Sequence, residues 1–222
     1  MRRHDLAYVL PNANFRFQCG ASNVALATQV SSWIGKGRPL VVARQTGQEH
    51  ELLLGLTLPT SEGRQRIGCL VHRRDVSRIS GPLALTACIH RLPPHIAPHL
   101  SALASRLADE DVEIGTYGSL AWEVLSQESY RHEASDVDVI CDVATLAQAE
   151  RALQALSDAA ALIPCGLDGE IRFPDGAAVA WKELAAAWNK GNSQVLVKGL
   201  QDVALLPLAS ILAQFNEVPA HA

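Results

Sequence analysis

Two aspartates separated by one residue, Asp136 and Asp138, constrain this sequence more than any other feature. They lie within residues 135–143, whose alternating apolar side chains predict a β-strand. Residues two apart in a strand point to the same face, so both carboxylates share one face while Val137, Val139 and Cys141 can be buried on the other. Neighbouring carboxylates repel each other unless a cation lies between them, and hard oxygen ligands suit Mg²⁺ bound together with substrate phosphates. The alternative is a solvent-facing strand without a ligand.

A glycine and a serine, Gly118 and Ser119, mark a turn from strand to helix upstream of this pair. Residues 112–117 predict a strand, and residues 118–129 have helical spacing. A helix N-terminus presents unpaired N–H groups that bind anions, and glycine lets the backbone approach a phosphate closely. A Gly-Ser turn alone is usually only a helix cap. Followed by the aspartate pair, it predicts a phosphate cradle facing a metal-binding pair, which is the arrangement that phosphoryl transfer requires.

The remaining pattern predicts an α+β chain of two domains. Residues 1–85 contain short candidate strands broken by Gly and Pro, which indicates a small β-rich domain; the candidates are 39–44, 52–56 and 67–71. Proline-punctuated helices around residues 80–95 are expected to act as a connector. Residues 86–222 then alternate between strands and helices, which predicts a mixed sheet with helices packed on it. A helix is expected at 144–160, strands at 170–173, 177–181 and 194–197, and a closing helix from about Leu200.

Composition excludes several classes of protein. With 222 residues, 48% of them hydrophobic and 19% charged, the chain can bury a core and is not expected to be disordered. No uncharged run approaches the ~20 residues of a membrane-spanning helix, and the first residues do not have the pattern of a signal peptide. The expectation is therefore a cytoplasmic protein. The five cysteines are far apart and never form a C-x-x-C pair, which argues against a disulfide framework or a zinc ribbon.

Charge is unevenly distributed along the chain. Residues 1–90 hold 11 Lys and Arg against 5 Asp and Glu, a net of +6, whereas residues 91–222 hold 8 against 18, a net of −10. Five arginines fall within fifteen positions: Arg64, Arg66, Arg73, Arg74 and Arg78. Such a cluster can attract nucleic acid or an acidic protein, or it can be a solvated face. No aromatic residue lies among the arginines to stack on bases, which argues against nucleic acid.

The motifs together resemble a known family. Gly-Ser followed downstream by Asp-x-Asp is similar to the core motif of the DNA-polymerase-β-like nucleotidyltransferase superfamily. The sequence most closely resembles the phosphoribosyl-dephospho-CoA transferases of malonate decarboxylase, which are holo-acyl-carrier-protein synthases. The specific part of the resemblance is Tyr117–Glu123 with Ser135–Asp138. Less specific pieces extend it over nearly the whole chain, at residues 4–6, 37–44, 55–59, 65–67, 167–170 and 179–183.

The resemblance implies a reaction and roles for residues. The donor is 2'-(5-triphosphoribosyl)-3'-dephospho-CoA. A serine of the acyl carrier protein subunit of malonate decarboxylase attacks the α-phosphorus, and diphosphate leaves. The resemblance implies that Asp136 and Asp138 bind Mg²⁺ and that Gly118 and Ser119 contact the triphosphate. The arginine cluster of the β-rich domain would then dock the acidic carrier protein.

The resemblance also implies a third carboxylate on a later strand, as a metal ligand or as a base for the attacking hydroxyl. Motif matching does not fix its identity. Glu170 is preferred because it begins an apolar strand; Asp168 comes second, and Glu183 third because it is expected to begin a helix. Lys182 and Lys198 are candidate phosphate contacts, with ordinary surface lysines as the alternative.

Two other functions fit parts of the sequence. One is a nucleotidyltransferase with a different target, of the antitoxin or antibiotic-modifying type, although such enzymes usually lack this N-terminal extension. The other is a non-catalytic carrier-binding module. Against the second stands the intact pair Asp136 and Asp138, because a retired site has no reason to keep two like charges on one face.

Overall fold

The computed structural model describes residues 1–18, 24–47, 49–132, 135–188, 190 and 193–217. The chain divides into two compact units, the first comprising Met1–Pro82 with Trp122–Arg131 and the second Leu83–Ala121 with His132–Ala222. The cysteines at 69, 88, 141 and 165 are not in disulfide bonds, while Cys19 lies outside the described residues. Within the described residues, no helix has both the length and the apolar character needed to cross a membrane.

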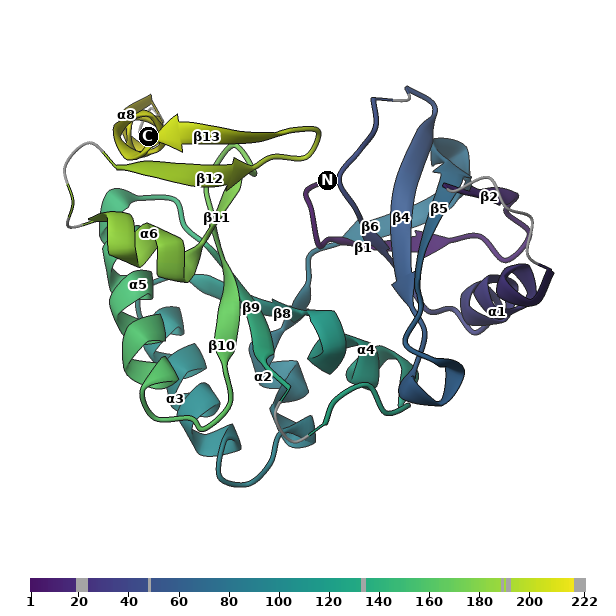
Figure 1. Ribbon diagram of the computed structural model, residues 1–222, viewed down its shortest axis with the longest axis horizontal. Coiled ribbons are helices and arrows are strands. Elements are labelled where there is room, and N and C mark those ends of the chain that lie inside the picture. The colour runs from purple at the N-terminus through teal and green to yellow at the C-terminus, as the bar shows by residue number, and fades with distance from the viewer. Residues whose placement is uncertain (19–23, 48, 133–134, 189, 191–192, 218–222) are drawn as a thin grey trace. The chain divides into compact units, whose positions relative to one another are not determined.

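The first unit is built on a six-stranded antiparallel sheet with strand order β2-β5-β4-β3-β1-β6 (Figure 1). The three strands expected here are confirmed as β3, β4 and β5, whereas β1, β2, β6 and helix α1 were not predicted. The helix packs its buried residues Val30, Trp33 and Ile34 into the core. The bounds are β1 Leu6–Val9, β2 Phe15–Phe17, α1 Val24–Gly35, β3 Leu40–Val42, β4 Glu51–Thr57, β5 Arg66–His72 and β6 Val76–Ser80.

The segment Trp122–Arg131 belongs to this first unit although it lies far along the chain. Trp122 packs edge-to-face on Trp33, with ring centroids 5.5 Å apart. The buried Tyr130 hydroxyl donates a hydrogen bond to the carbonyl of Thr57 (3.0 Å). Helix α4 (Gly118–Ser126) therefore begins in one unit and ends in the core of the other, whereas the sequence expectation assigned all of it to residues 86–222.

The second unit contains a seven-stranded mixed sheet with strand order β13-β12-β11-β10-β9-β8-β7. Only β9 and β10 run parallel, and every other neighbouring pair is antiparallel. The α+β architecture expected from the sequence, a β-rich domain followed by a mixed sheet with helices, is confirmed. The bounds are β7 Leu83–Ala84, β8 Glu113–Tyr117, β9 Val137–Asp142, β10 Leu167–Arg172, β11 Ala178–Ala180, β12 Gln194–Lys198 and β13 Val203–Pro207.

Helices α3 (Ala97–Ala108), α5 (Leu146–Ala160) and α6 (Trp181–Trp188) lie on one side of this sheet (Figure 1). Helix α5, expected at 144–160, begins at Leu146, because the hydroxyl of its N-cap Thr145 accepts a hydrogen bond from the Gln148 amide (3.1 Å). Helix α3 follows the expected proline-punctuated connector; it buries Leu100, Leu103 and Leu107 and is a core helix of the second unit. The short helices are α2 Leu85–Cys88, α7 Leu208–Leu212 and α8 Gln214–Glu217.

The closing helix expected from about Leu200 is wrong. Residues 203–207 instead form β13, which pairs with β12 through a turn in which the Gly199 amide donates to the Asp202 carbonyl. The apolar run is compatible with either structure, and the neighbouring strand decides between them by offering a full antiparallel ladder. Helical structure begins only at Leu208.

Candidate active site

The three central strands bring Tyr117, Asp138 and Asp168 into one row across the sheet. Tyr117 at the end of β8 lies opposite Asp138 on β9, and Asp138 lies opposite Asp168 on β10. Residues in direct register point to the same face, so the two carboxylates face the same side of the sheet. The buried Thr116 hydroxyl fixes the backbone here by donating a hydrogen bond to the Asp138 carbonyl (2.7 Å).

Gly118 lies directly beside the carboxylate of Asp138. A Cβ atom at this glycine would overlap Oδ2 of Asp138 and lie 3.0 Å from its Cγ. The backbone of Gly118 is also left-handed, with φ of +65°, so glycine is required by both conformation and space. Helix α4 starts at this residue, with Ser119 half-buried in its first turn. The structure thus brings a helix N-terminus and an aspartate together, as the sequence analysis expected.

Asp136 precedes β9, and its side chain lies toward β10, on the opposite side of β9 from Gly118. Its side chain is exposed and its carboxylate lies against Gly166, where a Cβ atom would be 2.7 Å from the Asp136 Cγ. Since Gly166 precedes β10 and Gly118 follows β8, Asp136 and Asp138 lean toward opposite neighbours of β9. In the described part of the chain, no group of three or more His, Cys, Asp or Glu side chains is arranged to hold a metal ion. The available donors are carboxylate oxygens, which suit Mg²⁺ only if phosphate and water oxygens complete its shell.

The three candidates for a third carboxylate lie in different environments. Asp168 is half-exposed in the row beside Asp138. Glu170 lies two residues further along the same face, is only 3% exposed, and pairs with Lys198 (Nζ–Oε1 2.9 Å). Glu183 uses Oε1 to accept a hydrogen bond from the Leu196 backbone amide (2.8 Å), where it supports β12. The register therefore favours Asp168, because it lies directly opposite Asp138. Glu170, the residue preferred from the sequence, lies two residues further along β10 and so farther from Asp138.

Both lysines predicted to contact phosphate are found beside carboxylates. Lys182, in the first turn of α6, contacts Asp168 (Nζ–Oδ1 2.5 Å), and both side chains are about half-exposed. An exposed pair of this kind is weak, so the Lys182 ammonium can exchange its partner for a bound phosphate at low cost. Lys198 is more buried and pairs with the buried Glu170. Lys182 therefore lies at the row, beside Asp168, whereas Lys198 is held by the buried Glu170.

An ion pair between the buried Arg172 and the partly exposed Asp142, which the sequence analysis did not identify, lies at the far end of the same face. Arg172 donates from Nε and Nη2 to the two carboxylate oxygens of Asp142, both at 2.6 Å. The two residues are opposite each other in the parallel β9–β10 ladder. No local pattern signals this pair, because it depends on the register of two strands separated by a helix. Its bidentate geometry stabilises the face on which the row is built.

Four of the five arginines predicted to form one cluster are in two groups, and the fifth lies on another strand. Arg64 and Arg66 lie at the beginning of β5 and Arg73 and Arg74 just after its end, so the seven-residue strand separates them by roughly 24 Å. Arg78 lies on β6, its guanidinium 3.9 Å from the centroid of the Tyr8 ring. Proximity in the sequence does not give one patch here, because an extended strand lies between the residues.

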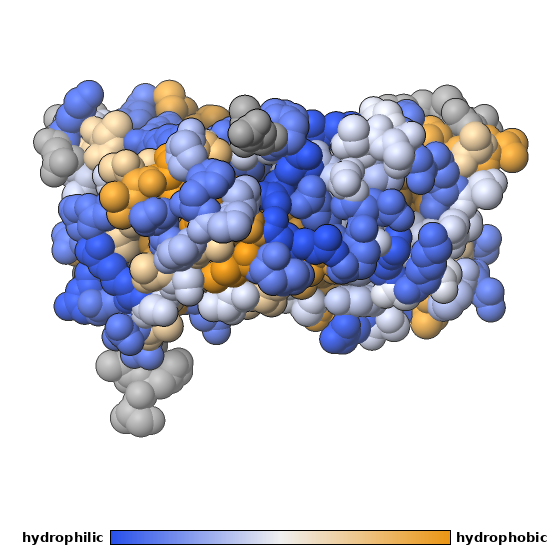
Figure 2. All heavy atoms as spheres, turned by 90° about the horizontal axis from the view of Figure 1, so that it is seen from below, coloured by the Kyte–Doolittle hydropathy of each residue, from blue (hydrophilic) through white to orange (hydrophobic). Residues whose placement is uncertain are grey.

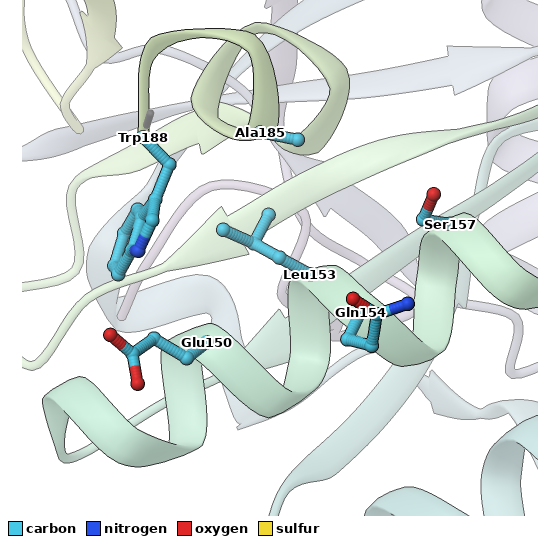
Figure 3. Close-up of a pocket in the computed structure, with 6 residues that line it drawn as sticks. All are labelled: Glu150, Leu153, Gln154, Ser157, Ala185 and Trp188. Atoms are coloured by element: carbon cyan, nitrogen blue, oxygen red, sulfur yellow. The ribbon is translucent and has the colours of Figure 1, made fainter. Parts of the chain in front are cut away.

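A groove of about 420 Å³ lies between α5 and α6 (Figure 3). The side chains that line it are Glu150, Leu153, Gln154, Ser157, Ala185 and Trp188. It is formed by two of the helices on one side of the sheet and contains no lysine or arginine that could neutralise a phosphate. The groove is therefore not the candidate active site. On the face of the molecule shown in Figure 2, hydrophilic residues predominate, with smaller hydrophobic areas between them.

Two family models together match almost the whole chain. The Phosphoribosyl-dephospho-CoA transferase MdcG N-terminal domain matches residues 2–82, and the C-terminal domain of the same family matches residues 84–209. The chain belongs to the phosphoribosyl-dephospho-CoA transferase family. The resemblance found in the sequence is confirmed at this level. The row of Tyr117, Asp138 and Asp168 lies within the C-terminal domain of the family.

Curated phosphoribosyl-dephospho-CoA transferases are similar over most of their length. The protein of that name from Xanthomonas axonopodis pv. citri is 34% identical, covering 94% of this chain and 95% of its own. Those from Bradyrhizobium diazoefficiens and Pseudomonas putida are 32% and 31% identical, over 92% and 83% of this chain and 89% and 85% of their own. No solved structure is significantly similar to the chain.

Proposed function

We propose that this chain, a phosphoribosyl-dephospho-CoA transferase by family, modifies a serine of the malonate decarboxylase acyl carrier protein. The donor is 2'-(5-triphosphoribosyl)-3'-dephospho-CoA. The serine oxygen attacks the α-phosphorus, the bond from that phosphorus to the bridging oxygen of the diphosphate breaks, and diphosphate leaves with the bridging oxygen. The observation that carries the proposal is the row of Asp138 and Asp168 beside Gly118, within the domain that the family model matches.

The N-terminus of α4 supports a role in holding the triphosphate. The first N–H groups of a helix are unpaired and bind anions, and Gly118 keeps its side of the site free of side-chain atoms. Ser119 can add its hydroxyl as a donor. Lys182, which leaves Asp168 at low cost, would supply a positive charge for the departing diphosphate.

We assign Asp168 as the carboxylate that accepts the proton of the serine hydroxyl. It lies beside Asp138 and is half-exposed, so an incoming hydroxyl can reach it. The proton of the serine hydroxyl would pass to the Asp168 carboxylate as the oxygen attacks. Glu170 is less suitable because it is buried and paired with Lys198.

Asp136 and Asp138 are the residues that would hold Mg²⁺. When bound, the ion would neutralise charge on the phosphates during transfer. Its support is the chemistry of the donor atoms: the Asp138 carboxylate lies beside the N-terminus of α4, and the Asp136 carboxylate lies two residues before it, against Gly166. The same arrangement supports placement in the DNA-polymerase-β-like superfamily, which we propose as the wider relationship of the second unit.

The carrier protein would dock on arginines of the first unit. The net charge of residues 1–90 is +6, and acyl carrier proteins are generally acidic around the modified serine. Because the arginines form two groups at the ends of β5, docking would use one of these groups. Charges of this kind act mainly on the rate of encounter.

The test is the mass of intact apo-carrier protein after incubation with the enzyme, Mg²⁺ and either the triphosphoribosyl donor or ATP. The proposal predicts addition of one phosphoribosyl-dephospho-CoA group to the carrier with the first donor and no nucleotidylation with ATP. Nucleotidylation from ATP would instead support a transferase of different target. An unmodified carrier with both donors would support a non-catalytic binding module.

A further inference from the structure

Three large apolar side chains are exposed on the hairpin of β12 and β13. Their exposed fractions are 39% for Leu196, 41% for Val203 and 57% for Leu205. Leu196 lies directly opposite Leu205, and Val203 is two residues from Leu205, so the three side chains point to one face and form a contiguous group. Single exposed apolar residues are ordinary, whereas a contiguous group is a candidate binding surface. We refer to Leu196, Val203 and Leu205 as the hairpin patch.

The hairpin patch lies on the same face of the sheet as the carboxylates. Lys198 is two residues from Leu196, and its ammonium reaches Glu170 (2.9 Å), which fixes the face to which both residues point. Glu170 is in turn two residues from Asp168. On the opposite face of β12, Val195 and Val197 are buried in the core. The patch therefore lies on the carboxylate face of the sheet, beyond the buried Glu170.

The distance from the carboxylates to the patch is set by the number of strands between them. In the order β13-β12-β11-β10-β9, strand β12 is three positions and β13 four positions from β9. At about 4.8 Å for each strand, these are roughly 14 and 19 Å from Asp138. The intervening β11 contributes only the small residues Ala178 and Ala180 to this face. A ligand anchored at the row would have to be long and extended to reach the patch.

The backbone of β13 adds hydrogen-bonding groups to the same place. The Leu208 amide donates to the Ser193 carbonyl and the Gly199 amide to the Asp202 carbonyl, and each bond joins two directly opposite residues. Because hydrogen-bonded pairs alternate along an antiparallel ladder, the even-numbered residues of β13 are those bonded to β12. The N–H and C=O groups of Val203 and Leu205 consequently point to the outer edge. In the described part of the sheet, β13 is the last strand and no strand pairs with this edge.

We infer that the hairpin patch binds the pantetheine arm of the dephospho-CoA donor, an inference that rests on the proposed function. The arm is long and uncharged, and it carries two methyl groups on one carbon and two secondary amides. The methyl groups would pack on Leu196 and Leu205, and the amides would pair with the outward N–H and C=O groups of Val203 and Leu205. Lys198, the cation opposite Val203 on this face, is paired with Glu170, and the three apolar side chains themselves attract neither a phosphate nor the acidic surface of a carrier protein, which favours an uncharged occupant.

The test compares dephospho-CoA with ADP, which is the same molecule without the pantetheine arm. Dissociation constants are measured by calorimetry with Mg²⁺ for the wild type and for Leu196→Ser with Leu205→Ser. The wild type is expected to bind dephospho-CoA more tightly than ADP. The double variant should bind dephospho-CoA roughly tenfold more weakly than the wild type, as expected for losing contact with about two methyl groups. Its dissociation constant for ADP should be unchanged. Leu162→Ser, at another exposed leucine of the second unit, is the matched control and should change neither constant.

Three results would overturn the inference. Dephospho-CoA affinity could be unchanged in the double variant, dephospho-CoA and ADP could be weakened equally, or the double variant could alter only the KM for the carrier protein or the state of self-association. If the double variant is less soluble, Leu205→Ser alone gives the same comparison with an expected loss of about threefold. Because the assay measures binding of a molecule that cannot be transferred, it can fail or succeed independently of the proposed reaction.

Discussion

The carboxylate of Asp138 packs against the α-carbon of Gly118, at the junction of β8 and α4. This contact joins the two motifs that the sequence places seventeen or more residues apart. It also explains why no larger residue fits at position 118: a Cβ atom would overlap the carboxylate, and the left-handed φ of +65° disfavours any side chain. The position of one catalytic candidate therefore depends on the absence of a side chain at the other.

Replacing Gly118 by alanine should displace Asp138 and reduce activity. A misplacement of about 1 Å in a catalytic group costs roughly 10²-fold in rate. The left-handed backbone should in addition lower the free energy of unfolding by about 1–3 kcal/mol. Steady-state transfer to the carrier and denaturant unfolding measure the two effects.

Gly37→Ala is the matched control for this change. Gly37 has a similar φ of +70°, but a Cβ atom there would meet nothing within 4 Å. It should lose a similar amount of stability and keep its activity. Equal activity of the two alanine variants would show that the contact between Gly118 and Asp138 has no part in the reaction.

Asp168→Asn and Glu170→Gln should have opposite profiles. If Asp168 accepts the serine proton, Asp168→Asn should lower kcat by roughly 10²–10⁴-fold with little change in stability. Glu170→Gln should retain most of its activity and lose about 1–3 kcal/mol of stability, because it removes the charge from a buried residue paired with Lys198. A harmless Asp168→Asn together with an inactive but stable Glu170→Gln would return the assignment to Glu170.

Glu123 should make the stability of the first unit depend on pH. Burial acts to raise the pKa of Glu123, but hydrogen bonds from the backbone amides of Arg131 and Tyr130 and from the Arg131 guanidinium outweigh it, so the pKa is held below its ordinary value. A carboxyl with a lowered folded-state pKa stabilises the protein above its unfolded pKa, and this contribution is lost as pH falls through the folded value.

The measurement is the Tm of the wild type and of Glu123→Gln across pH. The variant should melt roughly 4 °C lower at pH 7, and the difference should shrink once the pH falls below the ordinary pKa of 4.5. A difference that stays constant down to pH 3 would mean that the ionised form of Glu123 has no special role.

Reversing the charge of the arginines should identify the carrier-docking end of β5. Arg64→Glu with Arg66→Glu and Arg73→Glu with Arg74→Glu are compared, since the two pairs are separated by more than a Debye length of about 8–10 Å. One pair should raise the KM for carrier and flatten the salt dependence of transfer, while the other should do neither. Wild-type values for both would place docking away from these arginines.

The features that the sequence predicted well are those whose signal is local. Helix α5 has its N-cap at Thr145 and its apolar stripe in one segment, and strand β9 alternates through Val137 to Cys141. The Gly-Ser turn is likewise a short motif, and it lies beside Asp138, whereas Asp136, expected on the same strand face as Asp138, precedes β9 and lies against Gly166. The antiparallel pairing of β8 with β9 brings the turn to Asp138.

The features that the sequence did not predict depend on pairing between distant segments. The register of β10 against β9 favours Asp168 over Glu170 in the row, and the ladder between β12 and β13 replaces the expected closing helix. The division of the arginines between the two ends of β5 arises because an extended strand separates its ends. Each outcome is set by a partner strand, which local spacing does not encode.

The most direct test of the central claim is the intact mass of the malonate decarboxylase acyl carrier protein after incubation with the triphosphoribosyl donor, Mg²⁺ and either the wild type or Asp138→Asn. The wild type should add one phosphoribosyl-dephospho-CoA group to each carrier. Asp138→Asn should fold normally and leave the carrier unmodified, because it removes a carboxylate from the row beside Gly118. Modification by Asp138→Asn at the wild-type rate would contradict the account.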